Sequence, residues 1–168
     1  GGLSVVFAQP HRPKLGANFT RADHSRAGFS VTGQNFWAQT NGPQGGDGIA
    51  LATNSIGHVF VGTQGGGVFR STNNAETWTA VNNGLTDTNV RALAINSTGD
   101  IFGGTWSSGV FRSTDNGDSW SPVNNGLDSL SVRSLAINSE GDVFAGTFYG
   151  GVYRSTDNGE NWILLNTG

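Results

Sequence analysis

The sequence repeats itself with a period of 42 residues, and each copy contains the same short motif. Residues 113–120 read Ser-Thr-Asp-Asn-Gly-Asp-Ser-Trp, and residues 155–162 read Ser-Thr-Asp-Asn-Gly-Glu-Asn-Trp. An earlier copy at residues 71–78, Ser-Thr-Asn-Asn-Ala-Glu-Thr-Trp, has Asn and Ala where the others have Asp and Gly. A fixed period of this length is typical of repeat architectures, whose units bury apolar surface against their neighbours. The repeat constrains the fold more than the function, because a motif present in every copy is expected to have a structural role in each repeat unit.

Three copies align without gaps, and each predicts four short strands. The copies span residues 43–84, 85–126 and 127–168. In the third copy, the β-prone runs lie at residues 132–138, 143–147, 152–155 and 162–165. Segments rich in Gly, Asn and Asp separate these runs, and no window is free enough of such residues to favour a helix. Four antiparallel strands of this length make one blade of a β-propeller. The sequence therefore predicts an all-β fold of propeller-type blades.

The first 42 residues have the length of one copy but not its sequence. The tetrapeptide Phe7-Ala-Gln-Pro10 is what codons for Phe-Arg-Ser-Thr give when they are read one base out of frame. Lys14-Leu-Gly16 is related in the same way to Glu-Thr-Trp and lies at the matching distance. We therefore interpret residues 1–42 as a degenerate blade-like segment, with descent from a frameshifted blade as a hypothesis.

Composition excludes some classes of partner. The net charge is −3, and the nine Lys and Arg residues do not cluster, so no nucleic-acid or anionic membrane surface is expected. Cysteine is absent, which excludes disulfides and thiolate metal sites. No apolar run is long enough to span a bilayer. The composition, rich in Gly, Asn, Ser and Thr with few charges, favours an extracellular or periplasmic all-β protein, and nothing indicates a cofactor.

The repeated motif resembles the Asp-box, or BNR repeat, with the pattern Ser-x-Asp-x-Gly-x-x-Trp. The resemblance covers residues 43–168, and it implies blades similar to those of sialidases, sortilin-type receptors, some xyloglucan-cleaving enzymes and a photosystem-assembly factor. The positions that match in the second and third copies, with those retained in the first, are Ser113, Asp115, Gly117, Trp120, Ser155, Asp157, Gly159, Trp162, Ser71 and Trp78.

The Asp-box residues are predicted to be structural. Asp115 and Asp157 are expected to accept hydrogen bonds from turn N–H groups, and the following glycines to adopt positive φ. Trp120 and Trp162 are expected to be buried between blades and to donate their indole N–H there. A Ca²⁺ loop is the alternative, because carboxylates at short spacing suit a hard cation. We favour the turn and predict no metal site.

A ligand is expected on the face opposite the Asp-boxes, where the loops between the second and third strands meet the connections between blades. Those loops differ between copies, and they bring Trp106, Phe148 and Tyr149 to this face. The three rings could form a platform for sugar rings. The alternative, which we favour, is that they pack on the neighbouring blade.

Five arginines recur in the repeat. Arg91 and Arg133 open the first strand, where they either line the candidate ligand face or pair with Asp87 or Asp128. Three others lie next to the Asp-box turn, on the opposite face, and we do not expect them to clamp a substrate carboxylate; they are Arg70, Arg112 and Arg154.

No catalytic constellation is recognisable, since nearly all acids belong to the Asp-boxes or to other turns. The sequence therefore favours a non-enzymatic interaction or structural module. Closed propellers have four to eight blades, so we expect either a homo-oligomer or further blades of a longer chain, with a glycan or protein as ligand. A carbohydrate-binding module is the alternative, and a glycoside hydrolase-related fragment is less favoured.

Overall fold

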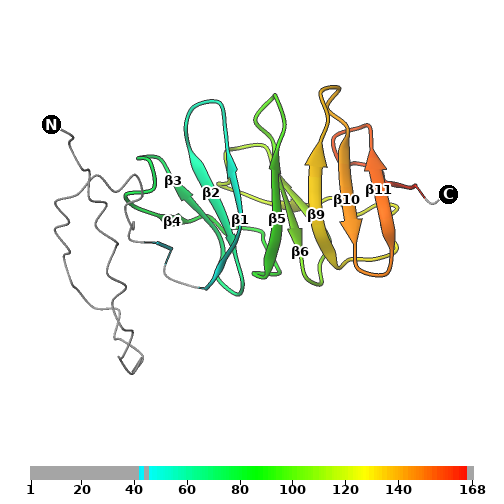
Figure 1. Cartoon of the computed structure of the whole chain (residues 1–168), viewed down its shortest axis with the longest axis horizontal. Coiled ribbons are helices and arrows are strands. Elements are labelled where there is room, and N and C mark those ends of the chain that lie inside the picture. Colours follow the sequence, from blue (N-terminus) through cyan, green and yellow to red (C-terminus); the bar gives the residue numbers. More distant parts are fainter. Residues whose placement is uncertain (1–41, 44–45, 166–168) are drawn as a thin grey trace, which may run out of the picture. The chain divides into compact units, whose positions relative to one another are not determined.

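The computed structural model describes residues 42–43 and 46–165, and this part of the chain is all-β without a helix (Figure 1). It contains three four-stranded antiparallel sheets, each falling within one 42-residue copy, and successive strands are neighbours in each sheet. The predicted all-β fold of four-stranded blades is confirmed. The frameshift hypothesis concerns residues that, apart from Gly42, lie outside the described part.

The strands follow the predicted runs closely. The first sheet consists of β1 (Gly48–Thr53), β2 (Val59–Thr63), β3 (Gly67–Ser71) and β4 (Thr79–Ala80). The second consists of β5 (Val90–Ile95), β6 (Ile101–Thr105), β7 (Val110–Ser113) and β8 (Ser121–Pro122). The third consists of β9 (Val132–Ile137), β10 (Val143–Thr147), β11 (Gly151–Ser155) and β12 (Ile163–Leu164).

The fourth strand is shorter than the sequence predicts. In the third sheet, β12 has two residues, whereas the run at 162–165 predicts four. Trp162 leaves the strand because its backbone N–H is donated to the carbonyl of Asn125 in the preceding copy, at 2.9 Å. The end of the third blade is thus tied to the preceding copy as well as to its own sheet.

The hydrophobic cores lie between the sheets. We call the contact between the first and second copies the first seam, and that between the second and third the second seam. The strands β1, β5 and β9 lie side by side across these seams (Figure 1). The core of the first seam comprises Phe60, Val68, Val81, Leu85, Val90, Ile101, Phe111 and Trp120. That of the second comprises Phe102, Val110, Val123, Val132, Val143, Ala145, Tyr153 and Trp162. Each sheet therefore depends on the next for burial of its apolar face.

The turn formed by the repeated motif, called the Asp-box turn here after the motif that it resembles, is held by its own side chains. The Ser113 hydroxyl accepts a hydrogen bond from the Gly117 N–H and donates one to the Asp115 carboxylate, both at 2.8 Å. Asp115 also accepts the Ser119 N–H at 2.8 Å, while Asn116 and Gly117 have φ values of 63° and 92°. The third copy repeats these contacts through Ser155, Asp157, Gly159 and Asn161.

The first copy keeps this turn despite its two substitutions. Asn73 replaces the aspartate, and its side-chain oxygen accepts the Thr77 N–H at 3.0 Å. Ser71 accepts the N–H of Ala75 at 2.9 Å, and Ala75 adopts a φ of 66° where the other copies have glycine. An amide oxygen thus replaces the carboxylate oxygen, and the alanine tolerates the left-handed conformation at a cost of roughly 1–2 kcal/mol.

The Asp-box tryptophans close the seams. Trp120 is buried in the first seam and donates its indole N–H to the Val81 carbonyl at 2.8 Å. Trp162 does the same to Val123 in the second seam, at 2.8 Å. Each ring therefore inserts into the preceding copy with its one polar group satisfied, as the sequence predicts.

The arginines beside the Asp-box bind the turn of the following copy. In the first seam, the Arg70 guanidinium donates to the Asn116 carbonyl at 2.7 Å and to the Asp118 carboxylate at 2.8 Å. The second seam repeats this arrangement with Arg112, Asn158 and Glu160. Arg154 has no following copy among the described residues and pairs with Asp142 of its own sheet at 2.6 Å.

Acid is expected to weaken the fold through the Asp-box turns. Hydrogen bonds from the Ser119 side chain and N–H and from Ser113 lower the pKa of Asp115 to about 2, and those from Asn161 and Ser155 lower the pKa of Asp157 to about 2. Because the carboxylates ionise more readily in the folded state, their contribution to stability is present above the ordinary pKa of 3.8 and is lost as the pH falls towards 2. Urea denaturation between pH 6 and pH 2 measures this loss. Asp115→Asn, which imitates the first copy, should flatten the decline, and an unchanged slope would contradict the assignment.

Candidate ligand face

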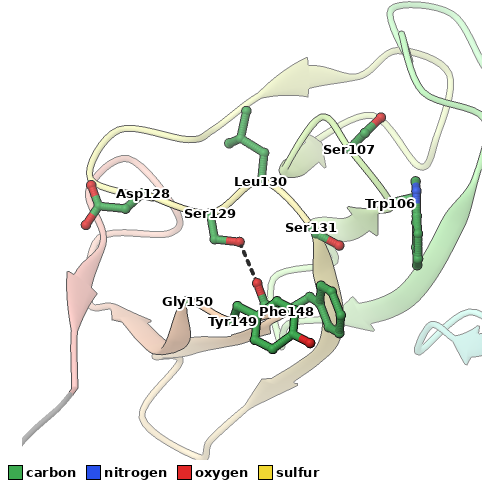
Figure 2. Close-up of a pocket in the computed structure, with 9 residues that line it drawn as sticks. All are labelled: Trp106, Ser107, Asp128, Ser129, Leu130, Ser131, Phe148, Tyr149 and Gly150. Carbon is green, nitrogen blue, oxygen red and sulfur yellow. Dashed lines mark hydrogen bonds between the residues drawn. The ribbon is translucent and has the colours of Figure 1, made fainter.

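Two sets of loops meet at the end of the sheets opposite the Asp-box turns. Successive strands run in opposite directions, so the loop between the second and third strands and the connection to the next sheet must share one end. Here they surround an open depression of about 530 Å³ (Figure 2). It is lined by Trp106, Ser107, Asp128, Ser129, Leu130, Ser131, Phe148, Tyr149 and Gly150. The loop after β6, the loop after β10 and the connection between the second and third sheets therefore form one surface.

A β-bulge places Arg91 and Arg133 beside this surface. In the pairing of β5 with β6, Val90 is opposite Thr105 and Ala92 is opposite Gly104, which leaves Arg91 as the extra residue. The register shift in the pairing of β9 with β10 leaves Arg133 in the same position. Bulges redirect side chains out of the regular alternation of a strand. The bulge thus accounts for the placement of both arginines at the loop end of their sheets.

The two arginines stack on the aromatic rings of the loops. The Arg91 guanidinium lies 4.3 Å from the Trp106 ring centroid. The Arg133 guanidinium lies 4.1 Å from Trp106 and 4.6 Å from Phe148, which belong to successive copies. We call Arg91, Trp106, Arg133 and Phe148 the stacked row. Trp106 thus contacts the neighbouring copy through Arg133, whereas Phe148 contacts the arginine of its own copy. A guanidinium that stacks on a ring can still donate hydrogen bonds from its edge.

Asp87 does not pair with these arginines. Its carboxylate accepts the Ser107 N–H at 2.8 Å, the Ser107 hydroxyl at 2.9 Å and the Asn89 N–H at 2.9 Å. Burial acts to raise the pKa of Asp87, but these hydrogen bonds outweigh it and hold the pKa below its usual value. Asp87 therefore stays ionised as a brace for the loop that carries Trp106. The ion pairs in the described part of the chain are Arg70–Asp118, Arg112–Glu160 and Arg154–Asp142. Of the two alternatives for Arg91 and Arg133, pairing with Asp87 or Asp128 is therefore not found among these residues.

Tyr149 is the most exposed of the aromatic residues on this face. Its side chain is 94% exposed, and its backbone adopts the left-handed region with a φ of 59°. Its ring lies against that of Phe148, with the centroids 4.0 Å apart (Figure 2). The left-handed backbone conformation of a bulky residue destabilises the fold by about 1–3 kcal/mol. Because Tyr149 is exposed, burial of its ring offsets little of this cost. Such retained strain is more frequent at binding sites than elsewhere.

Sequence reasoning missed part of this surface. The connecting residues Ser129, Leu130 and Ser131 line the depression, and the Ser129 hydroxyl donates to the Phe148 carbonyl at 3.0 Å. A signal for them was present in the sequence, because residues 128–131 of the third copy differ from the equivalent residues 86–89 of the second copy.

Within residues 42–43 and 46–165, no group of three His, Cys, Asp or Glu residues is placed to hold a metal ion. No helix suited to crossing a membrane occurs in the described residues.

Comparison with solved structures shows a propeller-blade fold. No protein-family model matches the chain, and no curated protein matches it significantly. An ancestral GH74 enzyme is similar over 76% of this chain and 19% of its own, with a TM-score of 0.61 and 23% identity. YCF48 bound to D1 peptide matches over 72% and 41%, with a TM-score of 0.57 and 19% identity. A GH74 enzyme from Niastella koreensis matches over 71% and 22%, with a TM-score of 0.55 and 20% identity.

These similarities establish the fold alone. The chain has the blades of a β-propeller, and it spans less than half the length of each of these chains.

Proposed function

We propose that this chain is a non-enzymatic Asp-box (BNR-type) propeller module that assembles through the outer face of its third sheet. The observation that carries the proposal is a comparison between copies. Val68 and Val110 are 0% exposed because the next sheet covers them, whereas the equivalent Val152 is 45% exposed. Leu165 is 43% exposed, whereas its counterparts Val81 and Val123 are both 7% exposed. A face of this kind is stabilised when a further blade covers it.

The acids of the described residues support a role other than catalysis. A glycosidase of the common type needs two carboxyl groups on either side of the scissile bond. On the ligand face, Asp87 is engaged by Asn89 and Ser107, and of the described acids only Asp128 lines the depression. The other carboxylates named above serve the turns and seams. We further propose an extracellular or periplasmic location, on composition alone.

Val152→Asp is expected to weaken assembly by about tenfold or more, because it would bury an unpaired carboxylate in the contact. Light scattering over a range of concentrations measures the mass of the wild type and of this variant. Ile163→Asp is the matched control, since Ile163 is exposed on the outer strand, as are Thr79 and Ser121 in the other copies. A well-folded wild type that stays at its 17.5 kDa monomer mass would overturn the proposal.

A second candidate function is carbohydrate binding, with the ligand face as the site. The observation that favours it is the exposed, strained Tyr149 beside the guanidinium groups of the stacked row, since sugars are held by aromatic faces together with hydrogen-bond donors. A glycan-array screen tests it with Trp106→Ala and with Tyr149→Asn, in which asparagine suits the left-handed backbone. If both variants retain wild-type binding, the aromatic site is not the carbohydrate site.

A further inference from the structure

We infer that the first seam contains a pH-sensitive lock, in which protonation of His58 breaks a ring of hydrogen bonds that joins the first copy to the second. His58 precedes β2 and stands where the other copies have Asp100 and Asp142. It is partly buried, and its partners are Asn54 in its own turn and Asn116 in the Asp-box turn of the second copy. All three members of the ring lie within the described residues.

The ring of hydrogen bonds begins and ends on His58. The His58 backbone N–H is donated to Asn54 Oδ1, the Asn54 Nδ2 group to Asn116 Oδ1, and the Asn116 Nδ2 group to His58 Nδ1, each at 2.9 Å. Because a backbone N–H is always a donor, it fixes the orientation of the first amide, and the first amide fixes that of the second. The ring is therefore complete only when His58 Nδ1 accepts, which requires the neutral imidazole with its proton on Nε2.

The second seam has the same ring with a carboxylate in place of the imidazole. The Asp100 N–H is donated to Asn96 Oδ1 at 2.8 Å, the Asn96 Nδ2 group to Asn158 Oδ1 at 3.0 Å, and the Asn158 Nδ2 group to the Asp100 carboxylate. A carboxylate remains an acceptor between about pH 5 and 8, the range in which histidine changes its charge. The two rings therefore differ in their response to mild acid.

Protonation gives the imidazole of His58 a second N–H, so that the chain of two amides has a donor at both ends. Turning the Asn116 amide would satisfy the new N–H, but it would set the Asn116 Nδ2 against the Asn54 Nδ2. Turning the Asn54 amide as well would set its Nδ2 against the His58 backbone N–H. Two amides cannot satisfy two terminal donors, so one hydrogen bond of the ring is lost in every arrangement.

The charged groups on the elements packed around His58 do not compensate for this loss. The strands β1 and β2 contain no charged residue, and Arg70 on β3 is paired with Asp118 of the second copy at 2.8 Å. Asp115 in the same Asp-box turn is engaged by that turn. Glu76 is equivalent to Asp118, whose partner lies in the preceding copy, so Glu76 lies on the other side of the first copy. Among the described residues, the carboxylates at the ring are thus already engaged.

Native-state hydrogen exchange of the full chain tests the lock with one reporter amide in each seam. The Trp120 N–H is bonded to the Asn83 carbonyl across the first seam at 2.8 Å, and the Trp162 N–H to the Asn125 carbonyl across the second at 2.9 Å. Between about pH 7.5 and about pH 5, the opening constant at Trp120, corrected for the intrinsic exchange rate, is expected to rise roughly three- to tenfold, the effect of one lost hydrogen bond. The opening constant at Trp162 is expected to change less.

His58→Asp is the matched variant, because it gives the first seam the acceptor that the second seam has, and it should abolish the rise at Trp120. Asn116→Gly keeps the left-handed backbone but removes the bridging amide, so it should abolish the rise as well. The other histidines, His11 and His24, are present in every variant and cancel in the comparison. If Trp120 and Trp162 respond together in the wild type but not in His58→Asp, the seams open as one unit and the inference stands. An equal rise in the wild type and His58→Asp, or NMR signals of the imidazole nitrogens that show a proton on Nδ1 at about pH 7.5, would overturn it.

Discussion

Trp120→Ala is expected to destabilise the described blades by about 3–5 kcal/mol, the range typical of removing a large buried aromatic side chain. The residue is 4% exposed and belongs to the core of the first seam together with Phe60 and Phe111. Its loss would also leave the Val81 carbonyl without its hydrogen bond from the indole. Marginally stable domains have about 5–15 kcal/mol in total, so this one change removes a large share. Urea denaturation followed by circular dichroism measures it.

Two further variants separate the causes of that loss. Trp120→Phe keeps most of the packing but removes the indole N–H, so it should cost about 1–3 kcal/mol, the cost of leaving a buried carbonyl unpaired. Trp78→Ala, measured at concentrations below association, should cost less than Trp120→Ala, because Trp78 is only partly buried and its N–H has no partner. If Trp78→Ala and Trp120→Ala lowered the free energy of unfolding equally, burial in the seam would not be the reason that Trp120 stabilises the fold.

The sequence predicts the strands and the Asp-box turns well because both are local. The turn at Asp115 needs only residues within four positions of each other, and Asn73 shows that an amide can serve in the same place. The insertion of Trp120 into the preceding copy also follows from the repeat, since a large apolar ring in every copy must be covered by a neighbour. The 42-residue repeat is thus sufficient to predict most of the fold.

The candidate site is less predictable because it depends on where neighbouring copies lie. The position of Trp106 at the loop end follows from the strand order, but its stacking with Arg133 joins two copies. No sequence pattern marks the bulges that single out Arg91 and Arg133. The role of Arg70 in the seam was likewise missed, because its partners lie more than a full period away at Asn116 and Asp118.

Gly126→Ala is expected to cost about 2–5 kcal/mol, although it adds only one methyl group. Gly126 has a φ of 91°, in which an alanine costs roughly 1–2 kcal/mol. The added Cβ would also clash with the Trp162 carbonyl oxygen, a backbone atom of the next copy. The clash can be relieved only by shifting Trp162, whose N–H is bonded to Asn125 at 2.9 Å, and overpacking of this kind costs about 1–3 kcal/mol more.

Gly141→Ala is the matched control for this prediction. Gly141 has the same φ of 91°, but an added Cβ meets no atom within 4 Å, so only the cost of the left-handed backbone of roughly 1–2 kcal/mol is expected. The difference between the two free energies of unfolding, measured by urea denaturation, isolates the close backbone approach at the second seam. If the variants are equally stable, the seam is loose enough to accommodate a methyl group. A clear difference means that the backbones of successive copies approach each other at the second seam too closely to admit a methyl group.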